Sequence, residues 1–289
     1  MKVFYHNDMD GRCAAFCVYE YYLGRNDSEL EFIEMNYNMP FPFDDVHKGE
    51  EVWIVDYSID PDEMDRLLGI TKNIHWIDHH VTAINKFSDY KINLNGIRLS
   101  GIAGCALTYK YIKKLEGDSS TIHDLDGVPE FIRLVHDRDV WKWEHGNKTG
   151  YFHLGMLARN THPTSKEWQD LASGASLEPI LAEGRVIQKY RDQWASDYLE
   201  SWGMDVIFEG HRCMAMNIGS VGSEYFESVR ERGYDIVIPF IFDGEKWSVS
   251  LFSLNKNVDV SKLAAKYGGG GHMDAAGFTC RELPFERCG

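Results

Sequence analysis

Short apolar runs alternate with helical patterns in the first half of the chain. The apolar runs have the length of strands, and between and after them apolar positions recur with the period of a helix. Strands are expected at Lys2–His6, Phe32–Tyr37, Glu51–Ser58 and Asn73–His79, and helices at Gly11–Leu23, Pro61–Leu68, Gly104–Lys114 and Pro129–His136. Strands that alternate with helices predict a parallel sheet covered on both faces. In such sheets, ligands gather beyond the carboxyl ends of the strands.

A long amphipathic pattern over Leu177–Trp202 separates this region from a second, smaller α/β pattern. Strands are expected there at Val206–Phe208, Arg212–Asn217, Ile236–Phe242 and Trp247–Leu254, and helices at Glu224–Arg232 and Val260–Tyr267. The pattern therefore predicts an α/β fold with two lobes. Its parts are a parallel-sheet domain at residues 1–176, a connector helix at 177–203 and a smaller domain at 204–289.

Composition narrows the class of partner. The 289 residues are 44% hydrophobic and 26% charged, which is typical of a globular protein. The formal net charge of −15 argues against a protein that coats duplex DNA or an anionic membrane, although bound cations would still allow a phosphate-bearing substrate. No secretory signal, no apolar run near membrane length and no paired cysteine spacing is found. We expect a cytoplasmic protein with reduced thiols and no membrane span.

Three of the expected strands end in carboxylate or imidazole side chains. Alternate residues of an extended chain share a face, so His6, Asp8 and Asp10 can point to one place. The other two strands end in Asp56 and in Asp78, His79 and His80. Oxygen and imidazole donors suit Mn²⁺ or a similar ion, and cations relieve the repulsion among the carboxylates. Any one of these motifs is more often a turn, a helix cap or a structural histidine, but their coincidence predicts a metal site.

Two further motifs are weak evidence for a functional site when each is taken alone. In His136-Asp137-Arg138-Asp139, either aspartate can complete a second metal site, and we favour Asp137 because it directly follows the expected helix. A solvated helix end is the alternative. Four successive glycines at 268–271 precede His272, and their backbone N–H groups can cradle phosphate oxygens. A flexible turn is the alternative there, and no GK[ST] follows, which disfavours a nucleotide triphosphatase.

Together the motifs resemble the DHH phosphoesterase superfamily, in the branch that carries a DHHA1 domain. They occur in the expected order over nearly the whole chain: His6-x-Asp8-x-Asp10-Gly11, Val55-Asp56-Tyr57-Ser58, Asp78-His79-His80, Asp137-Arg138-Asp139, and Gly269-Gly270-Gly271-His272 with Ala275-Ala276-Gly277-Phe278. The chain is most similar to the compact nano-RNase or oligoribonuclease type. It departs from the pattern at Asn255, where relatives often have an arginine.

The resemblance implies two Mn²⁺ ions, with Mg²⁺ or Co²⁺ as substitutes. The first ion would be held by His6, Asp8 and Asp56, and the second by Asp10, Asp56, His79 and Asp137. Catalytic roles fall to Asp56, Asp78, His79 and His80, with His80 on the scissile phosphate and Asp78 orienting the histidines. Substrate would be bound by His80 and, from the opposite lobe, by Gly269, Gly270, Gly271 and His272. The active site would then lie in the cleft between the lobes.

The implied activity is hydrolysis of short single-stranded oligonucleotides, such as nano-RNA or linear dinucleotides, to mononucleotides. A metal-activated hydroxide would attack phosphorus. Two alternatives stay open: an enzyme for another small phosphate compound (phosphoadenosine phosphate, a cyclic nucleotide or polyphosphate), and a non-catalytic nucleotide-binding sensor. Tyr57, Trp141 and Trp143 are candidates for stacking on bases, with core packing favoured for the tryptophans. We expect no long duplex and no membrane as partner, and the choice between monomer and homodimer is open.

Overall fold

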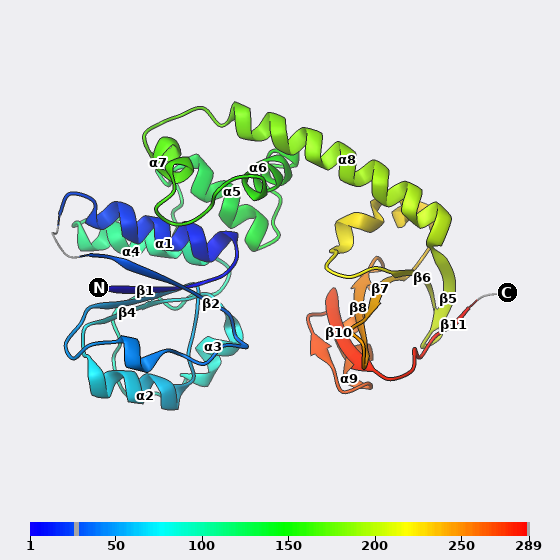
Figure 1. The fold of residues 1–289 in the computed structure, drawn as a ribbon, viewed down its shortest axis with the longest axis horizontal. Coiled ribbons are helices and arrows are strands. Elements are labelled where there is room, and N and C mark those ends of the chain that lie inside the picture. Colours follow the sequence, from blue (N-terminus) through cyan, green and yellow to red (C-terminus); the bar gives the residue numbers. More distant parts are fainter. Residues whose placement is uncertain (26–28, 288–289) are drawn as a thin grey trace. The chain divides into compact units, whose positions relative to one another are not determined.

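The computed structural model describes residues 1–25 and 29–287 (Figure 1). The chain divides into two compact units, Met1–Ile187 and Gln188–Gly289, and each is described by itself. The division falls within helix α8 (Glu178–Trp202), the helix that the sequence pattern predicts as a connector. The finer domain limits at residues 176 and 203 stay a prediction. Cys288 lies outside the described residues. No helix in the described ranges combines the length and the apolar character that crossing a membrane requires.

Unit 1 is built on a parallel sheet, which confirms the predicted α/β class. In the described part of the unit the strand order is β2 (Glu31–Met35), β1 (Lys2–His6), β3 (Val52–Val55) and β4 (Ile74–Ile77). All neighbouring strands pair in parallel. Strands β3 and β4 are shorter than the apolar patterns predicted, and the polar residues that follow Val55 and Ile77 form the candidate site.

Helices cover both faces of this sheet (Figure 1). One face carries α1 (Met9–Tyr22), α4 (Gly104–Leu115) and α5 (Glu130–Asp139), and the other carries α2 (Pro61–Ile70) and α3 (Val81–Lys86). Strand residues alternate between the two cores, as the period of two requires. Val3 and Tyr5 pack in the core with α1 and α4, whereas Phe4 packs with α2. Burying each such side chain contributes about 1.5–3 kcal/mol, so β1 anchors both faces.

The rest of unit 1 consists of short elements and of one helix that is longer than expected. The sequence pattern did not indicate α3, the 3-10 turn η1 (Phe43–Asp45), α6 (Asn147–Leu157) or α7 (Lys166–Ala172). Helix α5 continues to Asp139, three residues beyond the predicted end at His136. This extra turn decides which aspartate faces the candidate site.

Unit 2 contains a mixed sheet. In its described residues the strand order is β11 (Glu286–Arg287), β5 (Met204–Phe208), β6 (His211–Asn217), β7 (Ile236–Phe242), β8 (Trp247–Ser253), β10 (Ala275–Cys280) and β9 (Gly270–Gly271). Strands β6 and β7 are parallel and the other pairs are antiparallel. Helix α9 (Val260–Ala265) packs in one core of this unit, and η2 (Ser223–Arg232), predicted as an α-helix, is a 3-10 helix beside a second core.

Candidate active site

The polar strand ends of unit 1 meet because β1, β3 and β4 are neighbours in the parallel sheet. Asp56 follows β3 directly and adopts a left-handed backbone conformation (φ 54°) that few non-glycine residues accept. Its side chain is fully buried. The first residue of α4, Gly104, lies so close that an added Cβ would be 2.6 Å from the Asp56 Cβ. The start of α4 therefore packs directly on Asp56.

Asp10 is held by the same helix end. It lies in the first turn of α1 and is 2% exposed. Its carboxylate accepts hydrogen bonds from the Gly104 amide (2.6 Å) and the Cys105 amide (2.9 Å), the first two residues of α4. A helix N-terminus favours nearby negative charge. Helix α4 thus fixes one acidic group and presses against another.

Two histidines approach these carboxylates. His79 Nε2 lies 3.2 Å from Asp56 Oδ1, 3.4 Å from Asp139 Oδ2 and 3.7 Å from Asp10 Oδ2. His6 Nδ1 lies 2.7 Å from Asp8 Oδ2 and 3.9 Å from Asp56 Oδ2. Three groups in the described residues have ligand atoms within 4.8 Å of one another: His6, Asp8 and Asp56; Asp10, His79 and Asp139; and Asp56, His79 and His80.

The electrostatics of these groups favour bound cations. Both carboxylate oxygens of Asp56 are buried without a hydrogen-bond partner. Burial, and then the charges of Asp10 and Asp8, raise the pKa of Asp56 well above its usual range. Burial and then Asp10 also raise the pKa of Asp139. A native protein rarely leaves a buried carboxylate unpaired, so this donor set of carboxylates and imidazoles fits divalent ions such as Mn²⁺ or Mg²⁺.

Asp78 lies behind the histidine pair. It is fully buried and accepts hydrogen bonds from the His79 amide (2.7 Å), the His80 amide (3.2 Å) and the Ser58 hydroxyl. The His80 Nδ1 atom lies 2.7 Å from Asp78 Oδ1. Burial opposes a charged His80, but the hydrogen bond and charge of Asp78 outweigh burial and raise the pKa of His80. Burial lowers the pKa of His79, which favours the neutral imidazole that a metal ligand requires.

The structure brings Asp139, and not the favoured Asp137, to this cluster. Asp137 is 2% exposed and accepts hydrogen bonds from the Glu144 amide (2.8 Å), the His145 amide (3.1 Å) and the Thr149 hydroxyl. Residues two apart on a helix point to nearly opposite sides. Because α5 extends through Asp139, Asp137 faces the turn before α6 and Asp139 faces His79. The geometry therefore favours Asp139 over the preferred Asp137, and the choice of metal ligand between them stays a proposal.

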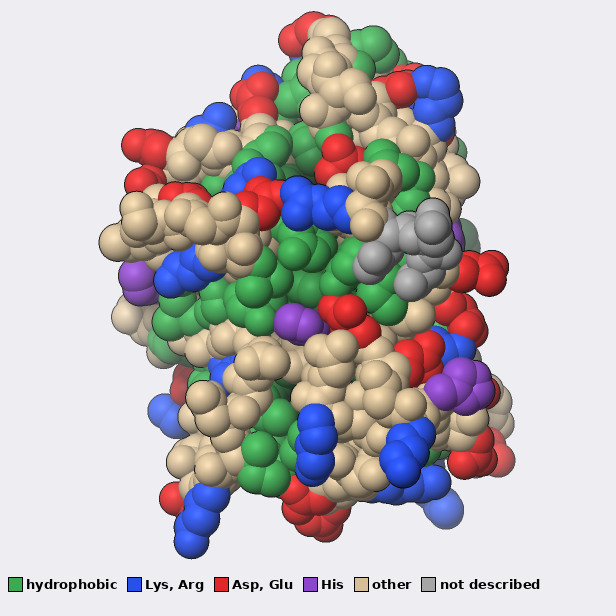
Figure 2. Space-filling model, turned by 90° about the vertical axis from the view of Figure 1, so that its left-hand side faces the viewer, with side chains coloured by type: hydrophobic (Ala, Val, Ile, Leu, Met, Phe, Trp, Pro, Cys, Tyr) green, Lys and Arg blue, Asp and Glu red, His purple; other side chains and the backbone are tan. Residues whose placement is uncertain are grey.

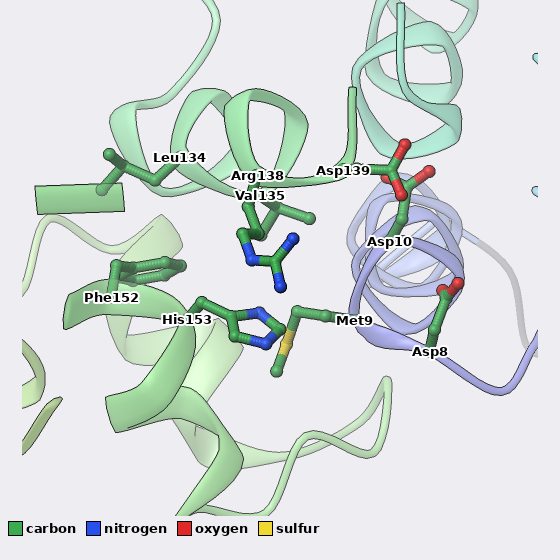
Figure 3. A pocket seen from close by; sticks show the side chains of 9 residues that line it. All are labelled: Asp8, Met9, Asp10, Leu134, Val135, Arg138, Asp139, Phe152 and His153. Atoms are coloured by element: carbon green, nitrogen blue, oxygen red, sulfur yellow. The ribbon is translucent and has the colours of Figure 1, made fainter. Parts of the chain in front are cut away.

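A cavity of about 200 Å³ adjoins the carboxylates. Asp8, Asp10 and Asp139 lie at one side of it, and Arg138 and His153 extend into it from α5 and α6 (Figure 3). The Arg138 guanidinium lies over the rings of two tryptophans, with its carbon 4.0 Å from the centre of Trp141 and 5.5 Å from the centre of Trp143. Core packing was the favoured interpretation for these tryptophans, but Trp141 is 46% exposed and both rings contact an arginine beside the acidic cluster.

The glycine motif lies in unit 2, at the edge of the mixed sheet. Gly270 and Gly271 form β9 and pair with β10. An added Cβ at Gly269 would be 2.1 Å from the Gly277 carbonyl oxygen, and Gly271 has a φ of 142°, so two of the glycines have a packing reason. His272 is exposed and its amide donates to the Ala275 carbonyl. Asn255 donates to Asp235 (2.8 Å).

One aromatic residue beside the cluster was missed by sequence reasoning. Tyr57, a predicted candidate for stacking, is 4% exposed, so its ring offers little open face. Tyr37 covers it and is 53% exposed. The available signal was position: Tyr37 follows β2, the strand next to β1, at the edge where His6 lies.

Comparisons with known proteins agree with this picture. No model of a known protein family matches the chain. Oligoribonuclease NrnB of Bacillus subtilis (strain 168) is 22% identical over an alignment that covers 97% of this chain and 73% of that protein. Among solved structures, a pGpG-specific phosphodiesterase, PggH from Vibrio cholerae, has a TM-score of 0.59 at 14% identity and covers 97% of this chain and 93% of its own.

A third relative contains metal. RecJ from Thermus thermophilus, in complex with Mn²⁺, has a TM-score of 0.51 at 13% identity and covers 96% of this chain and 49% of its own. These structures show the shared fold, and the motifs at the strand ends resemble those of DHH phosphoesterases. In its motifs, sequence and fold the chain is similar to proteins of the DHH/DHHA1 phosphoesterase superfamily, and these similarities support a hydrolase of phosphoester bonds.

Proposed function

We propose that the protein is a Mn²⁺-dependent phosphodiesterase that hydrolyses short oligonucleotides, such as nano-RNA or linear dinucleotides, to mononucleotides. The observation that carries this proposal is the buried carboxylate of Asp56, which has no hydrogen-bond partner and lies between groups of imidazole and carboxylate donors. The similarity to an oligoribonuclease and to a phosphodiesterase for a dinucleotide supports the choice of substrate class.

The proposed ligands follow the observed groups. His6, Asp8 and Asp56 would hold one ion, and Asp10, Asp56, His79 and Asp139 would hold the second. When bound, such ions lower the pKa of water and stabilise negative charge on phosphoryl oxygens. Asp139 takes the place that sequence reasoning gave to Asp137.

The side chains of this protein would orient the phosphate. His80, fixed through Nδ1 by Asp78, has its other ring nitrogen available to donate to a phosphoryl oxygen. The raised pKa of His80 favours the form that donates. Arg138 and His153 extend into the adjoining cavity and can donate to oxygens of the same substrate. Gly269, Gly270, Gly271 and His272 stay proposed contacts for a terminal phosphate or nucleotide.

Charge favours a short substrate. A protein that tracks a long strand needs a continuous basic groove. Figure 2 draws the side of the molecule at which β1 begins, away from the candidate site, and lysine and arginine side chains are scattered there among acidic ones. With a net charge of −15, attraction for phosphate would come mainly from the bound ions and a few donors beside them.

A substrate panel tests the proposal. Protein with measured Mn²⁺ content is assayed on di- and pentanucleotides, a cyclic dinucleotide, phosphoadenosine phosphate, pyrophosphate and polyphosphate, with Asp56→Ala as the inactive control. We expect the dinucleotides and pentanucleotides to be cleaved fastest and chelator to abolish the activity. Faster turnover of another compound would reassign the substrate. Metal-loaded protein that cleaves none of the panel would indicate a nucleotide sensor instead.

A further inference from the structure

Tyr37 is the outer ring of a two-ring stack at the edge of the candidate site. Its ring centre lies 5.1 Å from that of Tyr57 with an angle of 30° between the ring planes. Tyr57 is buried in the core that contains the apolar residues of α2, so its ring restricts the position of the Tyr37 ring from one side. The residue as a whole is 53% exposed, so Tyr37 lies at the surface while the Tyr57 ring covers one side of it.

The same ring contacts the two histidines that frame the site. Its centre lies 5.5 Å from the His6 ring and 6.1 Å from the His80 ring, and the His80 ring meets it edge to face at 81°. His6 belongs to a candidate metal group, and His80 is the proposed contact of the scissile phosphate. A group bound against Tyr37 would therefore belong to a nucleotide that adjoins this phosphate.

We propose that Tyr37 is the platform on which a nucleobase of the substrate stacks, an inference that rests on the proposed function. Every nucleobase has an aromatic face, so such a platform is tolerant of sequence. It would separate base-bearing phosphodiesters from pyrophosphate and polyphosphate, which have nothing to stack. Because Tyr57 holds the ring in place, little side-chain freedom would be lost on binding.

The experiment compares matched substrates and matched variants. The substrates are 5′-phosphorylated diadenylate and two analogues in which one or the other base is replaced by hydrogen. Tyr37→Leu keeps an apolar cover over Tyr57 but removes the aromatic face, and Tyr37→Phe keeps the face. Tyr90→Ala is the control. The Tyr90 ring is also partly exposed, but it packs on Phe87 and its hydroxyl donates a hydrogen bond to Asp65, and neither residue belongs to the candidate site. The Mn²⁺ content of every variant is measured.

We expect Tyr37→Leu to lower kcat/KM for diadenylate by about tenfold or more, mainly through KM, while Tyr37→Phe and Tyr90→Ala change it less than about twofold. Tyr37→Leu should have almost no effect on the analogue that lacks the stacked base, because the two changes remove the same contact. An equal loss on all three substrates would show that Tyr37 acts by supporting His6 and His80, and would overturn the inference. No loss on any of them would overturn it as well.

A binding measurement separates this inference from the proposed function. A dinucleotide that contains 2-aminopurine loses fluorescence when this base stacks, and the signal can be read on mixing, before turnover. Quenching by the wild type that Tyr37→Leu abolishes would support the platform even if no dinucleotide were cleaved, in which case only the proposed function would fail. Equal quenching by both proteins would overturn the platform and leave the proposed function standing.

Discussion

The assignment of the fourth motif depends on one pair of residues, Asp137 and Asp139. Both are acidic and lie at the end of α5, and only their direction separates them. Asp137 uses both carboxylate oxygens on protein donors, whereas Asp139 lies 3.4 Å from His79 Nε2. A carboxylate that is already satisfied by two amides and a hydroxyl supports the fold of the turn after α5. Substitution of Asp137 should therefore affect stability, whereas substitution of Asp139 should affect metal binding.

We predict that Asp139→Asn lowers the Mn²⁺ content and reduces kcat by at least about 100-fold, with little change in the stability of the metal-free protein. Asp137→Asn should instead destabilise the protein by about 1–3 kcal/mol, because the new amide group cannot accept from all three donors. Metal analysis and thermal unfolding in chelator distinguish these results. If Asp137→Asn lost the metal while Asp139→Asn kept it, Asp137 would be the ligand after all.

At the scale of elements, the site depends on how closely α4 approaches β3. Gly104 begins α4, donates to Asp10 and leaves no room for a Cβ beside Asp56. Helix α4 therefore sets the separation of two candidate ligands of the second ion. A small displacement of this helix end would move Asp10 and Asp56 apart.

We predict that Gly104→Ala strongly reduces activity and Mn²⁺ content, although the residue itself binds nothing through a side chain. The matched control is Gly69→Ala in α2, where an added Cβ meets no neighbouring atom within 4 Å. Alanine is the better helix former, so this control should be neutral or stabilise by up to about 1 kcal/mol. Equal activity of both variants would show that the contact at Gly104 is not needed for the site.

Elements and motifs were easier to predict than directions and distances. The predicted strand Lys2–His6 matches β1, since a buried strand and its polar end are local features. The left-handed backbone of Asp56 accompanies its close contact with Gly104, which is remote in the sequence, and no local pattern reports it. The three-residue extension of α5 reversed the choice between its aspartates. The proposed role of Tyr37 depends on its contacts with Tyr57 and two histidines, which the local sequence does not indicate.

At the scale of the whole molecule, a net charge of −15 adds to the local repulsion in the site. In the metal-free protein the pKa of Asp56 is raised by burial first and then by Asp10 and Asp8. The folded state thus holds this proton to a higher pH than the unfolded state does. By linkage, the stability that this group contributes is fully present below the usual carboxyl pKa of about 4 and is lost as pH rises through the folded pKa.

We predict that the metal-free protein becomes less stable from about pH 5 to pH 8, and that Asp56→Asn reduces this slope. Each pH unit over which one carboxyl stays protonated only in the folded state corresponds to about 1.4 kcal/mol, and each kcal/mol to about 2–4 °C in Tm. The raised pKa of His80 acts in the same direction but is common to both proteins.

The measurement is thermal unfolding in chelator at several pH values, repeated with Mn²⁺. Mn²⁺ should raise the Tm of the wild type more at about pH 8 than at pH 5, because protons compete with the ion for the same carboxylates. It should raise the Tm of Asp56→Asn much less. Parallel slopes for both proteins without metal would show that Asp56 does not carry the buried proton.

The left-handed backbone of Asp56 also limits which residues can replace it when catalysis is lost in evolution. Asparagine and glycine accept this conformation readily, whereas β-branched residues are strained in it. A descendant that abandons catalysis can therefore exchange this aspartate for asparagine and keep the same sheet and the same packing against α4, whereas glycine would keep the backbone and lose the side chain on which α4 packs. Such a chain would keep the fold of an enzyme, and the residue at this one position after β3 would distinguish a catalytically inactive protein from an active one.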